Sequence, residues 1–403
     1  MEDHVTRVLV GLGEYRVLGA CEDDDGVLVV TVEVPRAEAP CPGCGVFSGR
    51  VKQRRCQEIR DGLCFGRPTR LVWHKRRFRC DTPGCRSSFT ESTTQVPARA
   101  RVTTRLRTAI GRAGKTRSTA EVAADFGVSW WTAWRSIKAS ATAHVASLPA
   151  LPPAQMGLDE TTFRRPQRYA TGLVDLRTGR LWDLLEGRSK TVVVQRLEQL
   201  DPGALRSIGD VVIDPFAGYK AAVRDMAPTA RRTADRFHIV RLANQAVTDV
   251  RCRRQQELTG HRGRKTDPFY RARRDLLRAR ERLTGRQIAR VHDAFAADRT
   301  EQLWAAWIAK EGIRNLYRHT ERGDAEVFLD GWIDTFARCG IVELERLAAT
   351  IDRWHDEVLN YFDSRLTNGA TEGRNLTIKA VKRSGHGFRN FDNYRLRVLY
   401  RCS

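Results

Sequence analysis

Two aspartates in this sequence stand where a carboxylate could do chemistry. Asp159 follows a short apolar run in "QMGLDETTF", and Asp214 follows three consecutive apolar residues in "GDVVIDPFAGY", just before Pro215 and Gly218 turn the chain. A bare structural carboxylate at the centre or end of a strand is costly. Two carboxylates at the ends of adjacent strands also repel each other unless a cation holds them. Each aspartate taken alone is more often structural, and only the pair indicates a metal.

A third acid, Glu372, is the only acid in the strongly cationic stretch "TNGATEGRNLTIKAVKRSGHGF", residues 367–388. A glutamate in such a helix is usually a capping or solvated residue. If the helix packs beside the strands that carry the two aspartates, Glu372 completes a set of three oxygen ligands. Magnesium takes oxygen ligands and few protein carboxylates, so this set suits one or two ions. Lys379 follows Glu372 by two helical turns and therefore shares its face, with Asn375 between them.

Two cysteine pairs lie on Pro-Gly turns, in "CPGC" and "CDTPGC". Each turn points two thiolates at one centre, and four thiolates at tetrahedral positions suit zinc. Four protein ligands leave no open position for chemistry, which indicates a structural site. The long spacing between the pairs predicts β-strands between the two knuckles. Buried free thiols are the alternative, and Cys56 and Cys64 are alternative ligands outside the knuckles. The predicted ligands are Cys41, Cys44, Cys80 and Cys85.

Residues 118–140, "STAEVAADFGVSWWTAWRSIKAS", follow the pattern of a helix-turn-helix. Ala123 is small enough for two helices to cross closely, Gly127 supplies the tight turn, and Ser129 can cap the next helix. Ile137 then faces inward. A generic helical hairpin is the alternative, but the basic flanks favour DNA because phosphate contacts carry most of the affinity. The residues left exposed on the recognition helix are Trp130, Thr132, Arg135 and Lys138.

The elements that must position these residues change along the chain. Residues 1 to about 95 are rich in short β-type runs separated by turns, and residues 100–148 are helical. Residues 157–240 alternate strands and helices, which favours an α/β sheet beneath the aspartates. Residues 241–362 are helical and basic, and the last forty residues contain the helix with Glu372 and a short tail.

Composition and charge narrow the class of protein. The chain has 403 residues, a formal net charge of +22 and a pI of about 10.2. So many positive charges repel one another unless a polyanion binds beside them, and nucleic acid is the usual polyanionic partner. Residues 251–290 alone hold 14 lysines and arginines against 4 acids, too many for ordinary pairing along one helix. A ribosomal or membrane-surface protein could share the pI. No run of about 18 apolar residues exists, which predicts no membrane span.

The location of the protein follows from its first residues and its cysteines. The N-terminal stretch "MEDHVTRVLVGLGEY" is acidic and lacks the pattern of a signal peptide. A cytoplasmic protein is therefore expected, and its cysteines are then reduced or metal-bound rather than disulfide-linked.

The order of these parts resembles that of bacterial insertion-sequence transposases of the DDE type, and in particular the ISL-three family. The resemblance covers nearly the whole chain. The motifs that carry it are "CPGCG" with "RRFRCDTPGCRSSFTE", the "GLDE" strand, "VVIDPFAGY", "ADRFHIVRLAN" and "TNGATEGRNLTIKAVKRSGHGFRNFDNYRLRVL". It implies a multidomain α+β and α/β protein. Its expected parts are a β-rich zinc-binding domain, a helix-turn-helix, and an RNase H-like catalytic domain interrupted by an all-helical insertion.

The resemblance also implies where the domains begin and end. The 157 residues between Asp214 and Glu372 are too many for a simple crossover, which fits an insertion. The expected segments are 1–96 (zinc-binding, DNA-binding domain), 97–150 (helix-turn-helix), 151–244 (first part of the catalytic domain), 245–360 (helical insertion) and 361–403 (final catalytic helix and tail).

The chemistry that the resemblance implies is phosphoryl transfer in two steps. By it, Asp159, Asp214 and Glu372 are the three catalytic acids and bind two Mg²⁺ or Mn²⁺ ions per active site, while the cysteines bind one structural Zn²⁺. Water cleaves the phosphodiester at the transposon end, and the freed 3′-hydroxyl then attacks target DNA. No nucleophilic serine, tyrosine or cysteine is predicted, because no covalent enzyme intermediate is needed.

Further residues are assigned around the acids. Lys379 is similar to the DNA-contacting lysine of many DDE enzymes, with a solvated lysine as the alternative. Lys382 and Arg383 are assigned to DNA phosphates. His238, in "DRFHIV", and Asn375 are accessory candidates, although a core or helix-capping histidine fits the sequence equally well.

The expected partner is double-stranded DNA, both the terminal inverted repeats of the element and the target. Two ends must be held together before joining, so a homodimer or larger assembly is expected on DNA, at the bacterial nucleoid. Two alternatives remain open. A non-enzymatic zinc and helix-turn-helix regulator would have no use for the three acids. A structure-specific RNase H-like nuclease would have less use for the sequence-reading domains.

Overall fold

The computed structural model describes residues 11–403 except 12, 65, 86, 165 and 167. The chain forms two compact units. The described residues of the first unit lie within 11–148 and 383–401, and those of the second lie within 149–382 and 402–403. Within the described part of the chain, no helix is long and apolar enough to cross a membrane. The expectation of an N-terminus without a signal peptide concerns residues that lie mostly outside the described part.

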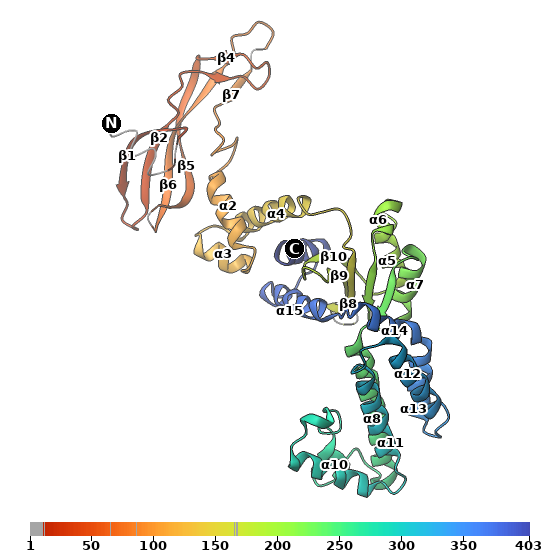
Figure 1. The fold of residues 1–403 in the computed structure, drawn as a ribbon. Helices are drawn as coiled ribbons and strands as arrows, with labels where there is room; N and C mark the ends of the chain where they lie inside the picture. The colour runs from red at the N-terminus through yellow and green to blue at the C-terminus, as the bar shows by residue number, and fades with distance from the viewer. Residues whose placement is uncertain (1–10, 12, 65, 86, 165, 167) are drawn as a thin grey trace. The chain divides into compact units, whose positions relative to one another are not determined.

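A twisted β-sheet forms the start of the first unit (Figure 1). Its order is β1-β2-β6-β5, with β7 paired to the end of β6; β2 and β6 are parallel and the other pairs antiparallel. A core around Trp73 and Tyr15, whose rings meet edge to face, holds the sheet together. The strands are β1 (Arg16–Glu22), β2 (Leu28–Glu33), β5 (Val51–Cys64), β6 (Arg67–Arg79) and β7 (Ser88–Thr90), with a small ribbon of β3 (Ala39–Pro40) and β4 (Phe47–Ser48).

Three helices follow the sheet and form the predicted helix-turn-helix. They are α2 (Thr104–Ala113), α3 (Thr119–Asp125) and α4 (Trp130–Ala146). Gly127 adopts a positive φ of 59° at the turn, Ser129 caps α4, and Ile137 is fully buried in the small core that the helices share. The final helix, α16 (Phe391–Cys402), packs on them: the Tyr400 hydroxyl donates to the Gly111 carbonyl, 3.1 Å away.

The second unit is built on a mixed sheet of order β10-β9-β8-β11-β12. Strands β8, β11 and β12 are parallel, whereas β9 and β10 run antiparallel beside β8. The helices α5 and α7 cover one face with Met156 and Leu158 beneath them. The elements are β8 (Gln155–Arg164), β9 (Arg168–Asp175), β10 (Leu181–Glu186), α5 (Lys190–Leu197), α6 (Pro202–Arg206), β11 (Asp210–Ile213), α7 (Ala217–Met226) and β12 (Arg231–Ala234).

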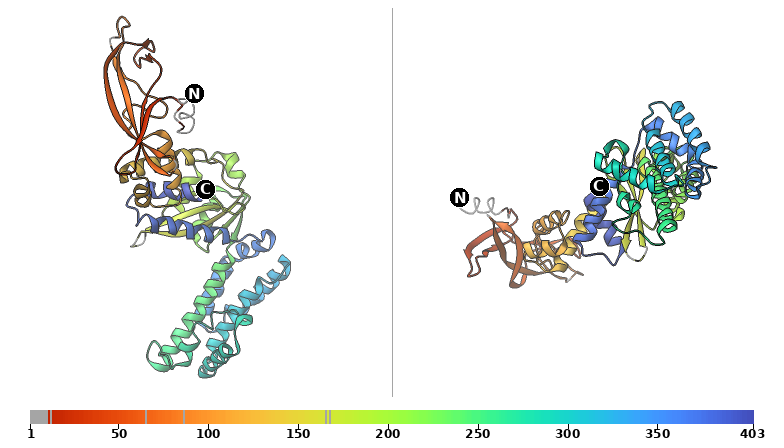
Figure 2. Two further views of the ribbon diagram at one scale, coloured as in Figure 1. Left: turned by 90° about the vertical axis from the view of Figure 1, so that its left-hand side faces the viewer. Right: turned by 90° about the horizontal axis from the view of Figure 1, so that it is seen from below.

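A helical bundle separates β12 from α15 (Gly369–Ser384), and its apolar core is continuous with that of the sheet. The long helices α8 and α11 lie side by side (Figure 2). The helices are α8 (Arg236–Thr259), α9 (Pro268–Ala272), the 3₁₀ turn η1 (Arg280–Arg282), α10 (Gly285–Ala297), α11 (Gln302–Leu316), α12 (Arg322–Phe336), α13 (Val342–Arg353) and α14 (His355–Ser364).

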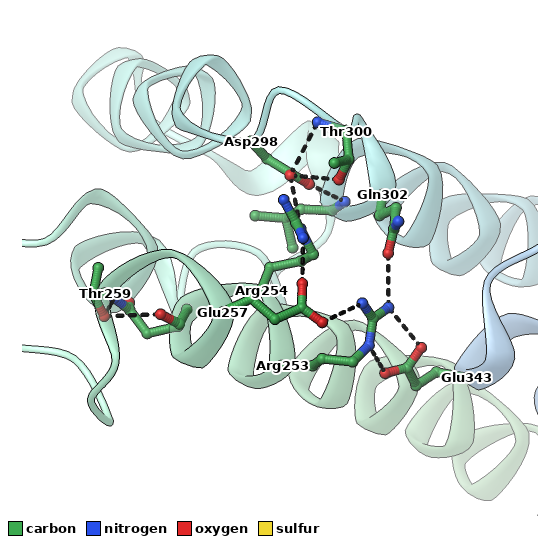
Figure 3. A network of polar contacts seen from close by, with 10 residues as sticks. Arg253, Arg254, Glu257, Thr259, Asp298, Thr300, Gln302 and Glu343 are labelled. Atoms are coloured by element: carbon green, nitrogen blue, oxygen red, sulfur yellow. Dashed lines mark hydrogen bonds and ion pairs between the residues drawn. The ribbon is translucent and has the colours of Figure 1, made fainter.

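Part of the positive charge of residues 251–290 is internal to this bundle (Figure 3). Arg253 Nε donates to Glu343, 2.7 Å away, and Arg254 Nε donates to Asp298, 3.0 Å away. Arg290 pairs with Asp275. The sequence count therefore overstates the charge that is free for a partner. The exposed cations of this stretch for which the described residues offer no side-chain ion pair are Arg262, Arg264, Lys265, Arg271, Arg274, Arg278, Arg280, Arg282 and Arg286.

Candidate active site, metal centres and DNA-facing surfaces

The register of three parallel strands places three aspartates in one row. Ile213 of β11 pairs with Leu158 of β8 and with Ala234 of β12. The next residue on each strand path is an aspartate: Asp159, Asp214 and Asp235. All three residues are buried, with exposed fractions of 7% for Asp159, 9% for Asp214 and 2% for Asp235. In open α/β sheets the carboxyl ends of parallel strands are the usual place for a site.

His238, one turn into α8, connects two of these aspartates. Its Nδ1 lies 2.9 Å from Asp214 Oδ1 and 3.0 Å from Asp235 Oδ2. Burial lowers the pKa of His238, but the hydrogen bonds to Asp214 and Asp235 outweigh it and raise the pKa to about 9. Burial, and then the charge of Asp214, raise the pKa of Asp159 to about 7. The row is thus an accumulation of buried negative charge that one histidine only partly offsets.

Helix α15 brings Glu372 and Asn375 to the row at different points. The ligand atoms of Glu372, Asp235 and His238 lie within 4.8 Å of one another, and those of Asp159, Asp214 and His238 form a second such group. Asn375 Nδ2 donates to Asp159 Oδ2 at 2.7 Å. Glu372 therefore lies at the end of the row that is formed by Asp235 and His238. This differs from the simple expectation of one cluster of two aspartates and Glu372, because Asn375, one turn later, occupies the position against Asp159.

The close approach of α15 to β8 depends on Gly157. A Cβ atom there would meet Thr371 Oγ1 at 2.3 Å and Asn368 Oδ1 at 2.5 Å, so no side chain fits. Gly157 and Asp159 share one face of β8, since strand side chains alternate. The fully buried Asn368 holds the row from this side: its backbone N–H donates to Asp235 Oδ1 at 3.0 Å, and its Nδ2 donates to the Leu158 carbonyl at 3.0 Å.

From the sequence alone, no role was assigned to Asp235 or to Asn368. Asp235 follows the short strand "RRTA", which has too few apolar residues to mark a buried strand by itself. A usable signal did exist: "VVID" and "RRTAD" both end a run with an aspartate, about twenty residues apart. Asn368 has no such signal, because its role depends on the packing of a loop that lies far from β8 in sequence.

A groove of about 620 Å³ opens beside Glu372 and Asp235. Its walls also carry Arg236, Phe237 and Arg282, of which the Phe237 ring is 57% exposed. Cations and an exposed ring beside a row of acids suit a nucleic-acid strand, whose phosphates need neutralising and whose bases stack.

The four predicted zinc ligands converge. Cys41 Sγ and Cys85 Sγ are 3.7 Å apart, and Cys44 Sγ and Cys80 Sγ are 3.6 Å apart. Ligands about 2.3 Å from a tetrahedral zinc lie about 3.8 Å from each other, so the thiols fit the ion. All four sulfurs lie within 4.8 Å of one another. The alternative ligands Cys56 and Cys64 lie on β5, outside this group.

The recognition helix presents most of the predicted residues. Trp130, Arg135 and Lys138 are exposed, while Thr132 is half-buried and its hydroxyl lies 2.9 Å from the Ser129 hydroxyl. A groove of about 620 Å³ runs between α2 and α4 beside Arg135. Its other cationic walls are Arg99, Arg101 and Arg107.

The cations predicted around Glu372 have different environments. Lys379 and Arg383 are exposed. Lys382 Nζ donates to the Thr162 carbonyl at 2.9 Å, which ties the end of α15 to β8. Arg374 Nε donates to the Gly179 carbonyl at 2.8 Å and fixes α15 to the turn between β9 and β10.

Comparison with known proteins identifies the family of the chain. A family model for DDE transposases of the ISL3 type, described as transposase, matches residues 156–398, which is more than half of the chain. The chain belongs to this transposase family. The zinc-finger model of the transposases IS204/IS1001/IS1096/IS1165 matches residues 37–85 of the transposase, and the helix-turn-helix model of transposase family ISL3 matches residues 91–141.

Curated relatives agree with the family. The transposase is 27% identical over 384 residues to the transposase for insertion sequence element IS1001 from Bordetella parapertussis, covering 94% of this chain and 92% of the relative. It is 28% identical over 256 residues to the transposase for IS1557 from Mycobacterium tuberculosis, covering 59% and 57% of the two chains. The transposase is therefore an enzyme that cleaves and transfers DNA, with a DNA-binding helix-turn-helix and a zinc ribbon.

The donor sets of this transposase fit the metals that its family implies. Four thiols suit zinc, and the buried carboxylates beside His238 suit a divalent cation, which would relieve their mutual repulsion. Other buried acids of the described residues pair with a lysine or arginine, as Asp183 pairs with Arg196 at 2.6 Å, whereas the acids of the row have no such partner.

Proposed function

We propose that Asp159, Asp214 and Glu372 are the catalytic acids of an RNase H-like domain and hold two Mg²⁺ or Mn²⁺ ions. The observation that carries this proposal is the strand register, which sets Asp159, in the middle of β8, level with Asp214, the residue that follows β11. The sheet order, three antiparallel strands continued by two parallel ones, supports the RNase H-like assignment. One structural zinc on the four cysteines completes the metal content.

The remaining residues have supporting roles in this proposal. Asn375 donates to Asp159 and orients its carboxylate, and Asn368 fixes the loop that precedes α15. His238 carries a proton between Asp214 and Asp235 and limits their repulsion. When bound, the ions activate water and stabilise the leaving oxygen. The protein side chains position the scissile phosphodiester, and the proposed phosphate contacts, all on α15, are Lys379, Lys382 and Arg383.

The reaction we propose has two steps at this one site. Water first attacks the phosphodiester at the transposon end and displaces the 3′-oxygen of the strand, which leaves as a hydroxyl. That 3′-hydroxyl then attacks a phosphodiester of the target, so one bond forms as one breaks and no covalent enzyme intermediate is needed. The helix-turn-helix reads the terminal inverted repeats through Trp130, Thr132, Arg135 and Lys138.

The domain boundaries that we propose are those expected from the sequence, with the addition that residues 383–401 pack with the first unit. The segments are 1–96 for zinc and DNA binding, 97–150 for the helix-turn-helix, 151–244 and 361–403 for the catalytic domain, and 245–360 for the helical insertion. A homodimer or larger assembly on paired ends, in the bacterial cytoplasm at the nucleoid, belongs to this proposal as well.

A direct assay tests the proposed function. The DNA flanking the reading frame should contain imperfect inverted repeats. A duplex with one repeat and its flank should be nicked at the repeat boundary by the purified enzyme in Mg²⁺, and a plasmid should receive the freed end. Cleavage at branched junctions without regard to the repeat would instead favour a structure-specific nuclease.

Recognition should depend on Arg135. If Arg135 reads a base, Arg135→Ala should cost about 1–3 kcal/mol on the cognate repeat and much less on a scrambled duplex. Arg107→Ala is the matched control, because Arg107 lies in the same groove on α2 and its removal should weaken binding equally for both duplexes. Fluorescence anisotropy at one salt concentration measures both. An unchanged curve for Arg135→Ala on the repeat would move recognition to another surface.

The exposed cations of the helical bundle should bind DNA without regard to sequence. Replacing Arg262, Arg264 and Lys265 with alanine should reduce the slope of log affinity against log salt by up to about 2.7, at about 0.9 for each phosphate that is no longer neutralised. Arg253→Ala is the contrasting variant, since its pairing with Glu343 predicts lower stability and an unchanged slope. If the triple variant keeps the slope of the parental protein, these three residues do not contact the DNA.

A further inference from the structure

Three tryptophans at the start of the recognition helix form one wall of a pocket in the first unit. Trp130 stacks on Trp134 with ring centroids 6.0 Å apart, and Trp131 stands perpendicular to Trp130 at 5.0 Å. Trp130 is 46% exposed and Trp131 65% exposed. Base edges are read mostly by polar side chains, so three clustered rings offer more aromatic surface than a base-edge contact by Trp130 would use. Large exposed rings are also costly unless a partner covers them. The cluster therefore indicates a ligand for flat aromatic surfaces.

The opposite wall comes from the last part of the chain. The loop between α15 and α16 contributes Phe388 and Arg389, and α16 contributes Arg397. The pocket has a volume of about 490 Å³, which is within the range of about 300–1,000 Å³ typical of small-molecule sites. No acidic residue occurs among the described residues that line it. The pocket is therefore aromatic and cationic at once.

Arg397 is an unusual residue for such a place. Only 7% of Arg397 is exposed, and no carboxylate among the described residues pairs with it. Its Nη2 donates to the Arg117 carbonyl at 2.8 Å, but its Nη1 is buried without a hydrogen-bond partner in the described structure. Burial lowers the pKa of Arg397 to about 10. A guanidinium that is desolvated and only partly satisfied is costly, and an anion would stabilise it.

We propose that this pocket holds one unstacked nucleotide of the DNA that the transposase binds, with its base on the tryptophans and its phosphate toward Arg389 and Arg397. Every base has a flat face that stacks on aromatic rings, and phosphate pairs with guanidinium groups. A nucleotide supplies both chemistries in one ligand. An apolar peptide from a second copy would cover the rings but would leave Arg397 without an anion. The proposal extends the DNA contact of the helix-turn-helix and does not depend on the catalytic acids.

A consequence concerns which DNA the enzyme prefers. Taking a nucleotide out of a duplex costs a few kcal/mol, and least where the base is mispaired or already single-stranded. The pocket should therefore favour DNA that is frayed, nicked or single-stranded beside the bound repeat, which is the state that cleavage of one strand creates.

The test uses the full-length transposase without Mg²⁺, so that no DNA is cut. One probe is a thymidine pentanucleotide, and the other is a pentamer with the same number of phosphates in which abasic spacers replace the nucleosides. Binding is measured by tryptophan fluorescence and by competition against a labelled thymidine pentamer. The parental protein should bind the thymidine pentamer more tightly than the abasic one. Trp131→Ala should reduce that preference by about 5- to 150-fold, the contribution of one stacked base. The fold should survive, because Trp131 is largely exposed.

Trp304→Ala is the matched control, since Trp304 is 48% exposed on α11 and does not line the pocket, and its removal should leave the preference unchanged. A second pocket variant, Arg389→Ala, should weaken both pentamers by a similar factor, because it removes a phosphate contact. Equal affinity of the parental protein for the two pentamers would overturn the proposal. So would an undiminished preference in Trp131→Ala, or self-association of the free protein that Trp131→Ala abolishes, which would assign the pocket to a second copy.

Discussion

The Glu372→Gln enzyme is expected to bind transposon ends as the parental enzyme does and to cleave them several orders of magnitude more slowly. The amide keeps the size and packing of the side chain but removes the negative charge that would hold a metal ion. DNA affinity should persist because the recognition helix and the cations of α15 are unchanged. Binding is measured by anisotropy in Ca²⁺ and cleavage by gel assay in Mg²⁺, on the same labelled end.

Two further variants and one control sharpen this prediction. Asp159→Asn and Asp214→Asn should separate binding from cleavage in the same way, and the losses should not multiply, because the proposed catalytic acids would act as one unit. Glu343→Gln is the matched control: Glu343 pairs with Arg253 in the helical bundle, so its change should affect stability and not cleavage. Near-parental cleavage by Glu372→Gln would exclude it as the third acid. Asp235, which shares the row, would then be the candidate.

Loss of zinc should have the second largest effect. Cys41 and Cys80 belong to a small core with Phe78 and Phe89 at one end of the first sheet. Cys41→Ser should open that end, because folding and metal binding are coupled in such sites. The rest of the sheet has a separate core around Trp73 and should stay folded. Affinity for the terminal repeat should fall steeply, while cleavage chemistry on DNA supplied at saturating concentration should persist.

The zinc prediction is checked by metal analysis and by binding. The parental protein should contain about one zinc per chain, and Cys41→Ser much less. Cys56→Ser is the matched control, because Cys56 is exposed on β5 outside the group of four thiols. Fresh native protein without zinc would refute the assignment, as would a Cys56→Ser variant that loses its zinc as readily as Cys41→Ser.

Local sequence patterns indicated several of the strands and drew attention to two of the proposed catalytic acids. An apolar run that ends in an acid identified Asp159 and Asp214, because burial of a strand is visible in its composition. The turn and caps around Gly127 were equally visible, since backbone chemistry there is local. Strand β5 was not singled out, because its sequence "VKQRRCQEIRDGLC" is mostly polar and its pairing with β6 determines its structure.

Features that depend on distant partners could not be predicted. The surplus of positive charge was counted within residues 251–290 alone. Arg253 and Arg254 are neutralised by Glu343 and Asp298, which lie outside that range of the sequence. The place of Asn375 against Asp159, which directs Glu372 toward Asp235, depends on how α15 sits on Gly157. Nothing in the local sequence of α16 shows that it packs on the helix-turn-helix.

The packing of α16 on α2 has a consequence for the order in which the protein can be completed during synthesis. Tyr400 and Arg397 contact Gly111 and Arg117, which leave the ribosome nearly three hundred residues earlier. Glu372 likewise joins strands made long before it. Neither unit can therefore complete its fold before the final forty residues are synthesised. A prematurely terminated chain would yield neither a complete end-binding fragment nor an active nuclease. Unfinished copies would then be unable to occupy repeats in competition with the full-length enzyme or to nick DNA on their own.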